Sequence, residues 1–246
     1  MPERPRAVPP SGKGPPPLAV ARPPTGGASP SVSAPPQRVS LEAFAAPWRR
    51  LRARPDPTPL HGVVCSAYRG PGRHYHTLDH IAHVLTVFDG IRHCLAEPDA
   101  AEMALWLHDL VYDTRATDSE AQSAAQARML LGPAGIKPDV VSKVADLILA
   151  TEHAADQEDP DARYVADTDL AILGAPSPDF ERYEQQIRRE YMWVPESTYR
   201  ARRAATLCRF LERPYIYQTP EFRHLETPAR INLAFALSHS QAPVKV

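Results

Sequence analysis

Three features are scarce in this chain of 246 residues, and each scarcity excludes a class of protein. The only cysteines, Cys65, Cys94 and Cys208, lie far apart and lack a CxxC spacing, so neither a disulfide framework nor a thiolate zinc site is indicated. No run of about 18 apolar residues occurs, so no segment is expected to cross a membrane. The formal net charge of −1 does not indicate an extended positively charged surface for binding a nucleic-acid duplex. A protein of the reducing cytoplasm fits these absences best.

Two sequence patterns are also missing. The chain has no Gly-rich phosphate loop, which argues against a nucleotide triphosphatase of the P-loop kind. It shows no convincing alternation of period two, whereas from about residue 40 the apolar positions recur at helical spacing. Leu41, Phe44, Trp48 and Leu51, for example, share one helical face. We therefore predict an all-α bundle, with its functional site between the central helices.

Capping residues, prolines and apolar spacing predict where the helices lie. One begins after Ser40, a second follows Pro59 and runs to about Tyr68, and a third carries His76 and His80. The Gly-Pro-Gly sequence before this third helix predicts a loop that delivers Arg73. Further helices are expected near 98–110, 117–131, 138–153, 164–173, 178–192, 195–212 and 220–239.

The first 38 residues differ in composition from the rest. Twelve of the 28 prolines fall there, mixed with Gly, Ser and Ala. Such a segment buries too little apolar surface to offset its ordering entropy, so we predict a disordered tail over 1–38. The remainder, 39–242, is expected to form one domain, and the 43% hydrophobic content of the chain is enough for a core.

The most informative residues are His80, in HYHTLDHIAH, and the adjacent pair His108-Asp109, in ALWLHDLVYDT. Two imidazoles and a carboxylate from neighbouring helices make most of a divalent-metal site, and a mixed N/O ligand set leaves positions open for water. Successive residues of a helix point about 100° apart, so His108 and Asp109 can hold one ion only from a helix end or across a groove.

These motifs carry a resemblance to a known family. The order YHTLDHI, LHDLVYD, SEAQSA, TEH, DTDLAILG and IRREY resembles a subgroup of predicted HD-superfamily metal-dependent phosphohydrolases, over about residues 41–240. The resemblance implies an HD-like helical fold and metal ligands His80, His108 and Asp109 with a distal Asp. Asp167 is favoured for that distal position, with Asp169 as the competitor. One departure is Asp118-Ser119-Glu120, where the family pattern reads Asn-Glu.

Two further histidines have open alternatives. His76 precedes His80 by one turn, on the same predicted helical face, which makes it a group that supports a ligand, a phosphate contact or a ligand of a second metal. His153, at the end of a predicted helix, is similar, because some HD enzymes add histidines for a second ion. A helix C-terminus also favours His through its dipole alone.

The acidic residues after the doublet are candidates for catalysis. The resemblance implies that Asp113 orders or deprotonates the attacking water, and its alternative is a cap for the following segment. Glu120, with Ser123, is expected to brace the site from the next helix.

Arg73 is a candidate phosphate contact, although a solvated Arg is the stronger expectation. A later arginine cluster is expected to form mainly a solvated face paired with Glu190 and Glu196, with part of it free to meet an anion: Arg188, Arg189, Arg200, Arg202, Arg203 and Arg209.

The expected activity is hydrolysis of a phosphate ester in a small phosphomonoester, nucleotide or nucleoside polyphosphate. The cofactor is one divalent ion or two, of Mn, Co, Ni, Fe, Zn or Mg, and the partner is a small anionic phosphorylated substrate, with a monomer or homodimer both open. A non-catalytic metal-binding or ligand-sensing module is the main alternative, and a diiron oxygenase on the same scaffold is a third.

Overall fold

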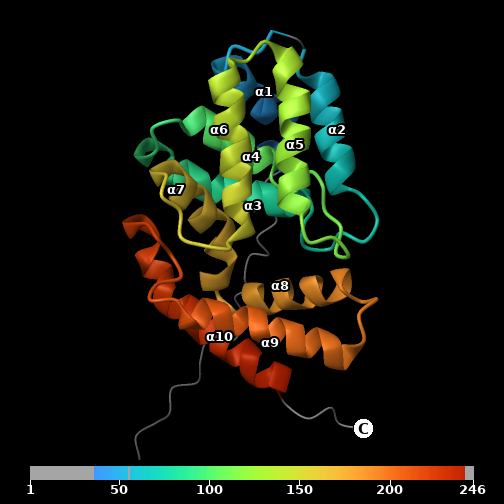
Figure 1. Ribbon diagram of the computed structural model, residues 1–246, viewed down its shortest axis with the longest axis vertical. Helices are drawn as coiled ribbons and strands as arrows, with labels where there is room; N and C mark the ends of the chain where they lie inside the picture. The colour runs from blue at the N-terminus through green and yellow to red at the C-terminus, as the bar shows by residue number, and fades with distance from the viewer. Residues whose placement is uncertain (1–35, 55, 242–246) are drawn as a thin grey trace, which may run out of the picture. The chain divides into compact units, whose positions relative to one another are not determined.

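The computed structural model describes residues 36–54 and 56–241, and these form ten α-helices and no strand (Figure 1). The all-α prediction is therefore confirmed at the level of class. The α-helices are α1 (Leu41–Arg50), α2 (Thr58–Tyr68), α3 (Leu78–Ile91), α4 (Pro98–Leu107), α5 (Ser119–Leu131), α6 (Pro138–Leu149), α7 (Pro160–Asp169), α8 (Ser177–Glu190), α9 (Glu196–Glu212) and α10 (Glu226–Gln241). Short 3₁₀ turns adjoin them: η1 (Pro36–Val39), η2 (Arg92–Cys94), η3 (Gly132–Ala134), η4 (Ala150–Glu152), η5 (Leu170–Gly174) and η6 (Pro220–Leu225).

Helix α4 is the centre of the core. Every residue from Ala100 to Leu107 is buried, which is the pattern of a helix surrounded on all sides. Pro98 opens the helix at a position where its missing N–H costs nothing, and the buried Asp161 carboxylate of α7 accepts the backbone N–H groups of Ala96 and Glu97 just before it. Helices α1, α3, α5, α6 and α7 pack around α4.

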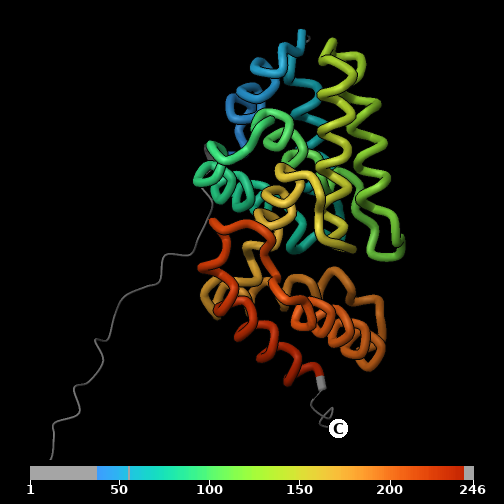
Figure 2. The backbone as a smooth tube through the Cα atoms, turned by 60° about the vertical axis from the view of Figure 1, so that its left-hand side comes forward, coloured from blue at the N-terminus to red at the C-terminus, as the bar shows by residue number. Residues whose placement is uncertain are grey.

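A second group of helices, α8, α9 and α10, lies beyond one end of the α5–α6 pair (Figure 2). Helix α10 packs along α9, and both α8 and α10 contact η5, the turn that follows α7. The segment from α7 through η5 therefore joins the core helices to this second group. None of the helices in 36–54 and 56–241 combines the length and apolar character needed to cross a bilayer.

Several helix boundaries differ from the predicted ones for local reasons. Helix α3 begins at Leu78, because the Thr77 side chain caps it by accepting the Asp79 N–H, so His76 lies in the preceding loop and not on the helix. Helix α7 begins at Pro160, four residues earlier than expected, because Asp159 caps it. The predicted helix 220–239 divides into η6 and α10.

The expected tail 1–38 lies outside the described residues apart from its last three. Those three belong to η1, where the Arg38 guanidinium donates to the Leu85 carbonyl and pairs with Asp89 of α3.

Candidate metal centre

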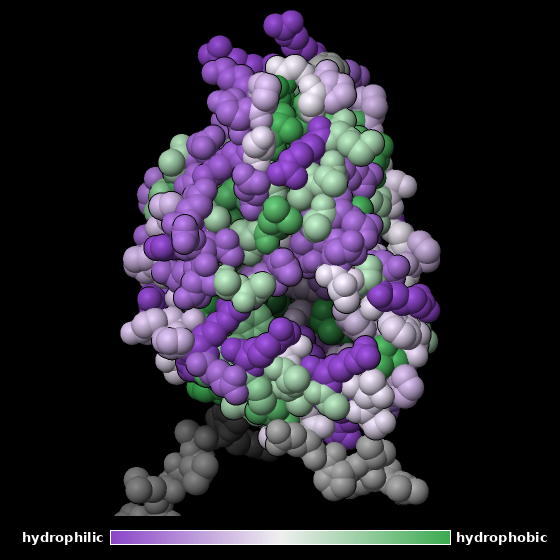
Figure 3. All heavy atoms as spheres, in the orientation of Figure 1, coloured by the Kyte–Doolittle hydropathy of each residue, from purple (hydrophilic) through white to green (hydrophobic). Residues whose placement is uncertain are grey.

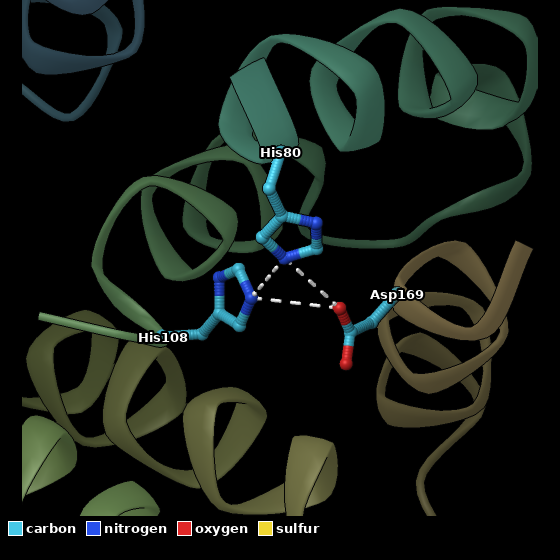
Figure 4. Close-up of side chains that lie close together, drawn as sticks. All are labelled: His80, His108 and Asp169. Carbon is cyan, nitrogen blue, oxygen red and sulfur yellow. Dashed lines mark hydrogen bonds and ion pairs between the residues drawn. The ribbon is translucent and has the colours of Figure 1, made fainter. Parts of the chain in front are cut away.

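Three side chains from separate segments converge on one point (Figure 4). His80 projects from the first turn of α3, His108 follows the last residue of α4, and Asp169 ends α7. The Nε2 atoms of His80 and His108 are 3.0 Å apart, and the Asp169 Oδ1 atom lies 3.3 Å from the first and 3.5 Å from the second. Both imidazoles are buried, at 3% and 1% exposure.

Asp109 adds a second carboxylate to this cluster. Its Oδ2 atom lies 3.1 Å from His108 Nε2 and 3.5 Å from His80 Nε2, yet it is buried without a well-formed hydrogen bond to any described residue. Such an orphaned acceptor among inward-facing nitrogens is what a bound cation would satisfy. Because α4 ends at Leu107, both members of the doublet reach the same point from a helix end, as the sequence required.

The geometry of the cluster fits a single divalent ion. Ligands held at about 2.1 Å from one ion lie roughly 3.0–3.4 Å from each other, close to the separations seen here. Two imidazoles and two carboxylates form a mixed N/O set suited to Mn, Fe, Co, Ni or Zn. Residues His80, His108, Asp109 and Asp169 are therefore able to hold the metal.

The electrostatics of the cluster favour a positive charge at its centre. Burial alone would raise the pKa of Asp109 and of Asp169, but the surrounding imidazoles outweigh it and hold both pKa values below the ordinary range. Both carboxylates are thus ionised at neutral pH. Burial lowers the pKa of His80, which keeps that imidazole neutral and able to ligate.

Neighbouring groups orient these ligands. The Nδ1 atom of His108 lies 2.9 Å from the Leu105 carbonyl and donates its proton to it, so Nε2 is the atom that faces the cluster. The Asp109 and Asp169 carboxylates raise the pKa of this imidazole well above its ordinary value, so a cation at the centre would replace the proton on Nε2. The Asp109 backbone N–H donates to the Tyr68 hydroxyl, which in turn donates to the Trp106 carbonyl. These contacts fix the doublet at the end of α4.

His153 lies beside the cluster and contacts Asp169. Its Nε2 atom is 2.8 Å from Asp169 Oδ2, the oxygen that faces away from the two imidazoles. His153 ends η4 with φ 56°, a left-handed conformation that few non-glycine residues adopt. The structure thus gives His153 the role of holding a ligand in place, one of the alternatives that the sequence left open.

The structure does not place Asp167, the residue favoured for the distal position, in the cluster. Asp167 is fully buried, and its carboxylate accepts the Gln218 N–H at 3.0 Å, the Thr219 N–H at 2.7 Å and the Thr219 hydroxyl at 2.6 Å. All its strong interactions are therefore directed to the segment before η6. Asp169, two residues later, faces the imidazoles instead and is the aspartate of α7 that joins the cluster.

His76 contacts an acidic residue that the sequence analysis assigned elsewhere. Glu190 is buried, and its Oε1 atom accepts the backbone N–H groups of His74, Tyr75 and His76. Its Oε2 atom lies 2.7 Å from His76 Nδ1 and accepts the Tyr112 hydroxyl at 2.8 Å. The Arg188–Glu196 pair forms as expected, but Glu190 is not part of that solvated face. The local sequence IRREY does not indicate that Glu190 is buried whereas Glu196 pairs with Arg188.

The structure does not bring Arg73 or Asp113 into contact with the cluster in the way that the sequence suggested. The Arg73 guanidinium donates to the backbone carbonyls of His76, Asp109 and Leu110, and it lies over the Tyr68 and Tyr112 rings. Arg73 therefore holds the loop before α3 to the His108-Asp109 doublet and the residue that follows it. Asp113 is exposed, and its carboxylate accepts the Arg115 N–H at 2.9 Å, which is the capping alternative.

Glu120 and Ser123 occupy the positions expected for bracing residues on α5. The Ser123 hydroxyl accepts the Val111 N–H and donates to the Val111 carbonyl, which anchors the chain just after the doublet. Burial raises the pKa of the Glu120 carboxyl, and the nearby charge of Asp109 raises it further. Glu120 is therefore a carboxyl group near the cluster with increased proton affinity.

A cavity of about 520 Å³ opens beside the cluster. Its lining includes four acidic residues, Asp109, Asp169, Glu120 and Glu152, and three arginines: Arg203 and Arg209 of α9, and Arg213, which follows the helix. Aromatic side chains complete the lining: Tyr75, Tyr112, Tyr183, Tyr191 and Phe210. In Figure 3 this face of the molecule is hollowed between the core helices and α8–α9, and strongly hydrophilic side chains border the hollow. Part of the arginine cluster thus does face a space that can hold a ligand.

Comparisons with protein-family models, with curated proteins and with solved structures found no match for this chain. The functional assignment therefore depends on the geometry of the site and on the motif order in the sequence.

Proposed function

We propose that this protein is a metal-dependent phosphohydrolase that cleaves a phosphate ester in the cavity described above. The observation that carries the proposal is the convergence of His80, His108, Asp109 and Asp169 beside a cavity whose lining also includes arginines. A divalent ion in this cluster supplies a Lewis acid for a phosphoryl oxygen and lowers the pKa of a bound water toward neutrality.

The remaining residues have roles that follow from their contacts. His153 holds Asp169 through its outer oxygen, and Ser123 and Tyr68 hold the doublet in place. Glu120 lines the same cavity and has a pKa raised by burial, and we assign to it the role of accepting a proton from the attacking water. Arg213 lies close to this end of the cavity, because its guanidinium donates to the His153 carbonyl, and it is suited to bind phosphoryl oxygens.

Membership of the HD superfamily is part of this proposal. The order of motifs supports it, and Asp169 then occupies the distal ligand position of the family. The substrate is a small phosphomonoester, a nucleotide or a nucleoside polyphosphate, since a cavity of about 520 Å³ accommodates molecules of these sizes. The proposed site differs from a P-loop site in the side chains that would hold the metal, which here are two histidines and the terminal aspartate of α7.

The test compares two Asp→Asn substitutions on one loop. Asp109→Asn removes a proposed ligand, whereas Asp113→Asn changes an exposed carboxylate that does not line the cavity. We expect Asp109→Asn to lose bound metal and to lower kcat/KM by about a thousandfold, which corresponds to roughly 4 kcal/mol. Asp113→Asn should retain metal and most of the activity.

The measurements are metal content by elemental analysis and phosphate release from nucleotides and sugar phosphates with Mn, Co, Ni or Mg added. Wild-type protein that binds metal at one equivalent but releases no phosphate from any substrate would contradict a hydrolase and support the metal-binding module. A large loss of activity in Asp113→Asn with Asp109→Asn unaffected would reverse the assignment of roles.

A further inference from the structure

The α9 wall of the cavity carries positive charge that the protein itself does not compensate. Arg203, Arg209 and Arg213 all line the cavity. Arg203 is neutralised, because its guanidinium pairs with the Glu184 carboxylate and donates to the Tyr183 hydroxyl. Arg209 and Arg213 differ from it, since neither has a carboxylate partner within residues 36–54 and 56–241. Two guanidinium groups in a cavity wall thus keep most of their N–H donors free for a ligand.

Hydrogen bonds link one of the two unpaired arginines to the metal cluster but not the other. Arg213 is linked to it through His153, whose carbonyl accepts from Arg213 and whose imidazole contacts Asp169. Arg213 is the residue that follows α9, and Arg209 precedes it by four positions in the last turn of the helix, a rise of about 6 Å. Its only hydrogen bond in the described structure is a long one, to the Thr206 hydroxyl at 3.4 Å. The cavity lining therefore holds a second guanidinium, separate from the one that is linked to the cluster through His153.

We propose that Arg209 binds a second anionic group of the substrate, and that the natural substrates are phosphate esters with another phosphate or carboxylate about one helical turn away. The inference rests on the proposed function for the position of the reacting group. A guanidinium fork matches the oxygens of phosphate or carboxylate and forms paired, charge-assisted hydrogen bonds with them. The carboxylates that line the cavity repel an anion unless a bound metal offsets their charge. Arg209 is positively charged and attracts an anion without a metal.

The experiment uses substrates that differ only in a second phosphate: fructose 6-phosphate with fructose 1,6-bisphosphate, and adenosine 5′-monophosphate with adenosine 3′,5′-bisphosphate. Full-length wild-type protein is compared with Arg209→Ala and Arg209→Lys. Arg202→Ala is the matched control, because Arg202 is an exposed arginine of α9 that does not line the cavity. For each protein, kcat/KM is measured with added Mn²⁺, and equilibrium binding of the same compounds to Mn²⁺-loaded protein is measured by calorimetry.

We expect wild-type protein to favour at least one bisphosphate over its monophosphate by about tenfold or more, in kcat/KM and in binding, which is the gain of one good charge-assisted contact. In Arg209→Ala this ratio should fall to near one through a higher KM and Kd, with Arg209→Lys intermediate and Arg202→Ala like the wild type. Equal use of both members of each pair, or an unchanged ratio in Arg209→Ala, would overturn the inference.

The two readouts separate this inference from the proposed function. Selective binding of a bisphosphate that is lost in Arg209→Ala, without hydrolysis of any compound, supports the anion site and rejects the hydrolase. Hydrolysis of monophosphates and bisphosphates at equal rates supports the hydrolase and rejects the anion site.

Discussion

Asp167 and Asp169 are two residues apart at the end of α7, and their partners give them different roles. Asp167 accepts three hydrogen bonds from Gln218 and Thr219, so it holds the core to the segment before η6. Asp169 faces His80 and His108 and is held from outside by His153. The same side chain therefore contributes to stability at one position and to metal binding at the other.

This division predicts opposite results for two identical substitutions. Asp167→Asn replaces an acceptor with an amide NH₂ opposite N–H donors, and we expect it to lower the free energy of unfolding by about 1–3 kcal/mol while metal binding persists. Asp169→Asn should weaken metal binding by about a hundredfold or more and change the stability of the metal-free protein much less. Urea unfolding with a chelator present and calorimetric titration with Mn²⁺ measure the two effects. Metal binding lost in Asp167→Asn but retained in Asp169→Asn would refute the assignment.

At the scale of elements, one buried carboxylate organises the loop that leads into α3. Glu190, the last residue of α8, accepts three consecutive backbone N–H groups from His74 to His76 and also contacts the His76 ring and the Tyr112 hydroxyl. The His76 and Tyr112 rings stack at 4.1 Å. These contacts join the second helix group to the loop that precedes α3 and to the loop that follows the His108-Asp109 doublet, so α8 supports the cluster without supplying a side chain to it.

The Glu190 contacts predict a defined pH dependence of stability. Burial alone would raise the pKa of Glu190, but His76 and the backbone donors lower it from 4.5 to about 2. Because the folded-state pKa is depressed, the carboxylate stabilises the fold above its unfolded-state pKa, and the stabilisation is lost as pH falls toward 2. Glu190→Gln should therefore lower the free energy of unfolding at pH 7 by up to about 3 kcal/mol.

The measurement is chemical unfolding of wild-type protein and Glu190→Gln between pH 7 and pH 3.5. The difference in free energy of unfolding between them should shrink by about 1 kcal/mol over this range, mostly below pH 4.5. Glu181→Gln, in an exposed carboxylate of the same helix that forms no ion pair within residues 36–54 and 56–241, gives the background acid dependence. A difference that stays constant with pH would mean that the charge of Glu190 is not what stabilises the loop.

How far the sequence predicted these elements depends on whether the signal was local. Ser40 and the Pro195-Glu196 pair are signals within one turn, and α1 and α9 begin where they indicated. The position of His76 depended on where α3 starts, and Thr77, a capping residue inside the predicted helix, moved that start. Asp167 and Glu190 find their partners 51 and 114 residues away, and no local pattern encodes contacts at that separation.

At the scale of the whole molecule, the metal centre connects segments that are distant in the chain. His80 belongs to α3, His108 and Asp109 follow α4, and Asp169 ends α7 beside the turn that joins the second helix group. The sequence indicated the doublet and His80 because imidazole and carboxylate groups are common metal ligands and their motif order is distinctive, and the structure brings both histidines together with Asp169. It could not distinguish two aspartates of one helix, since that choice depends on which side of α7 meets Gln218 and Thr219.

An ion that links these segments binds the folded chain and not the unfolded one, so it must raise thermal stability. At a free Mn²⁺ concentration about 100 times its Kd, the added stability is about 2.7 kcal/mol, which corresponds to a Tm increase of roughly 5–10 °C for a domain of this size. We expect this increase relative to protein treated with a chelator, measured by differential scanning calorimetry. Asp169→Asn should show little of it, whereas Asp113→Asn should show all of it. An equal increase in Asp169→Asn would mean that the stabilising ion binds elsewhere, because a site that includes Asp169 cannot keep its full affinity when that carboxylate is removed.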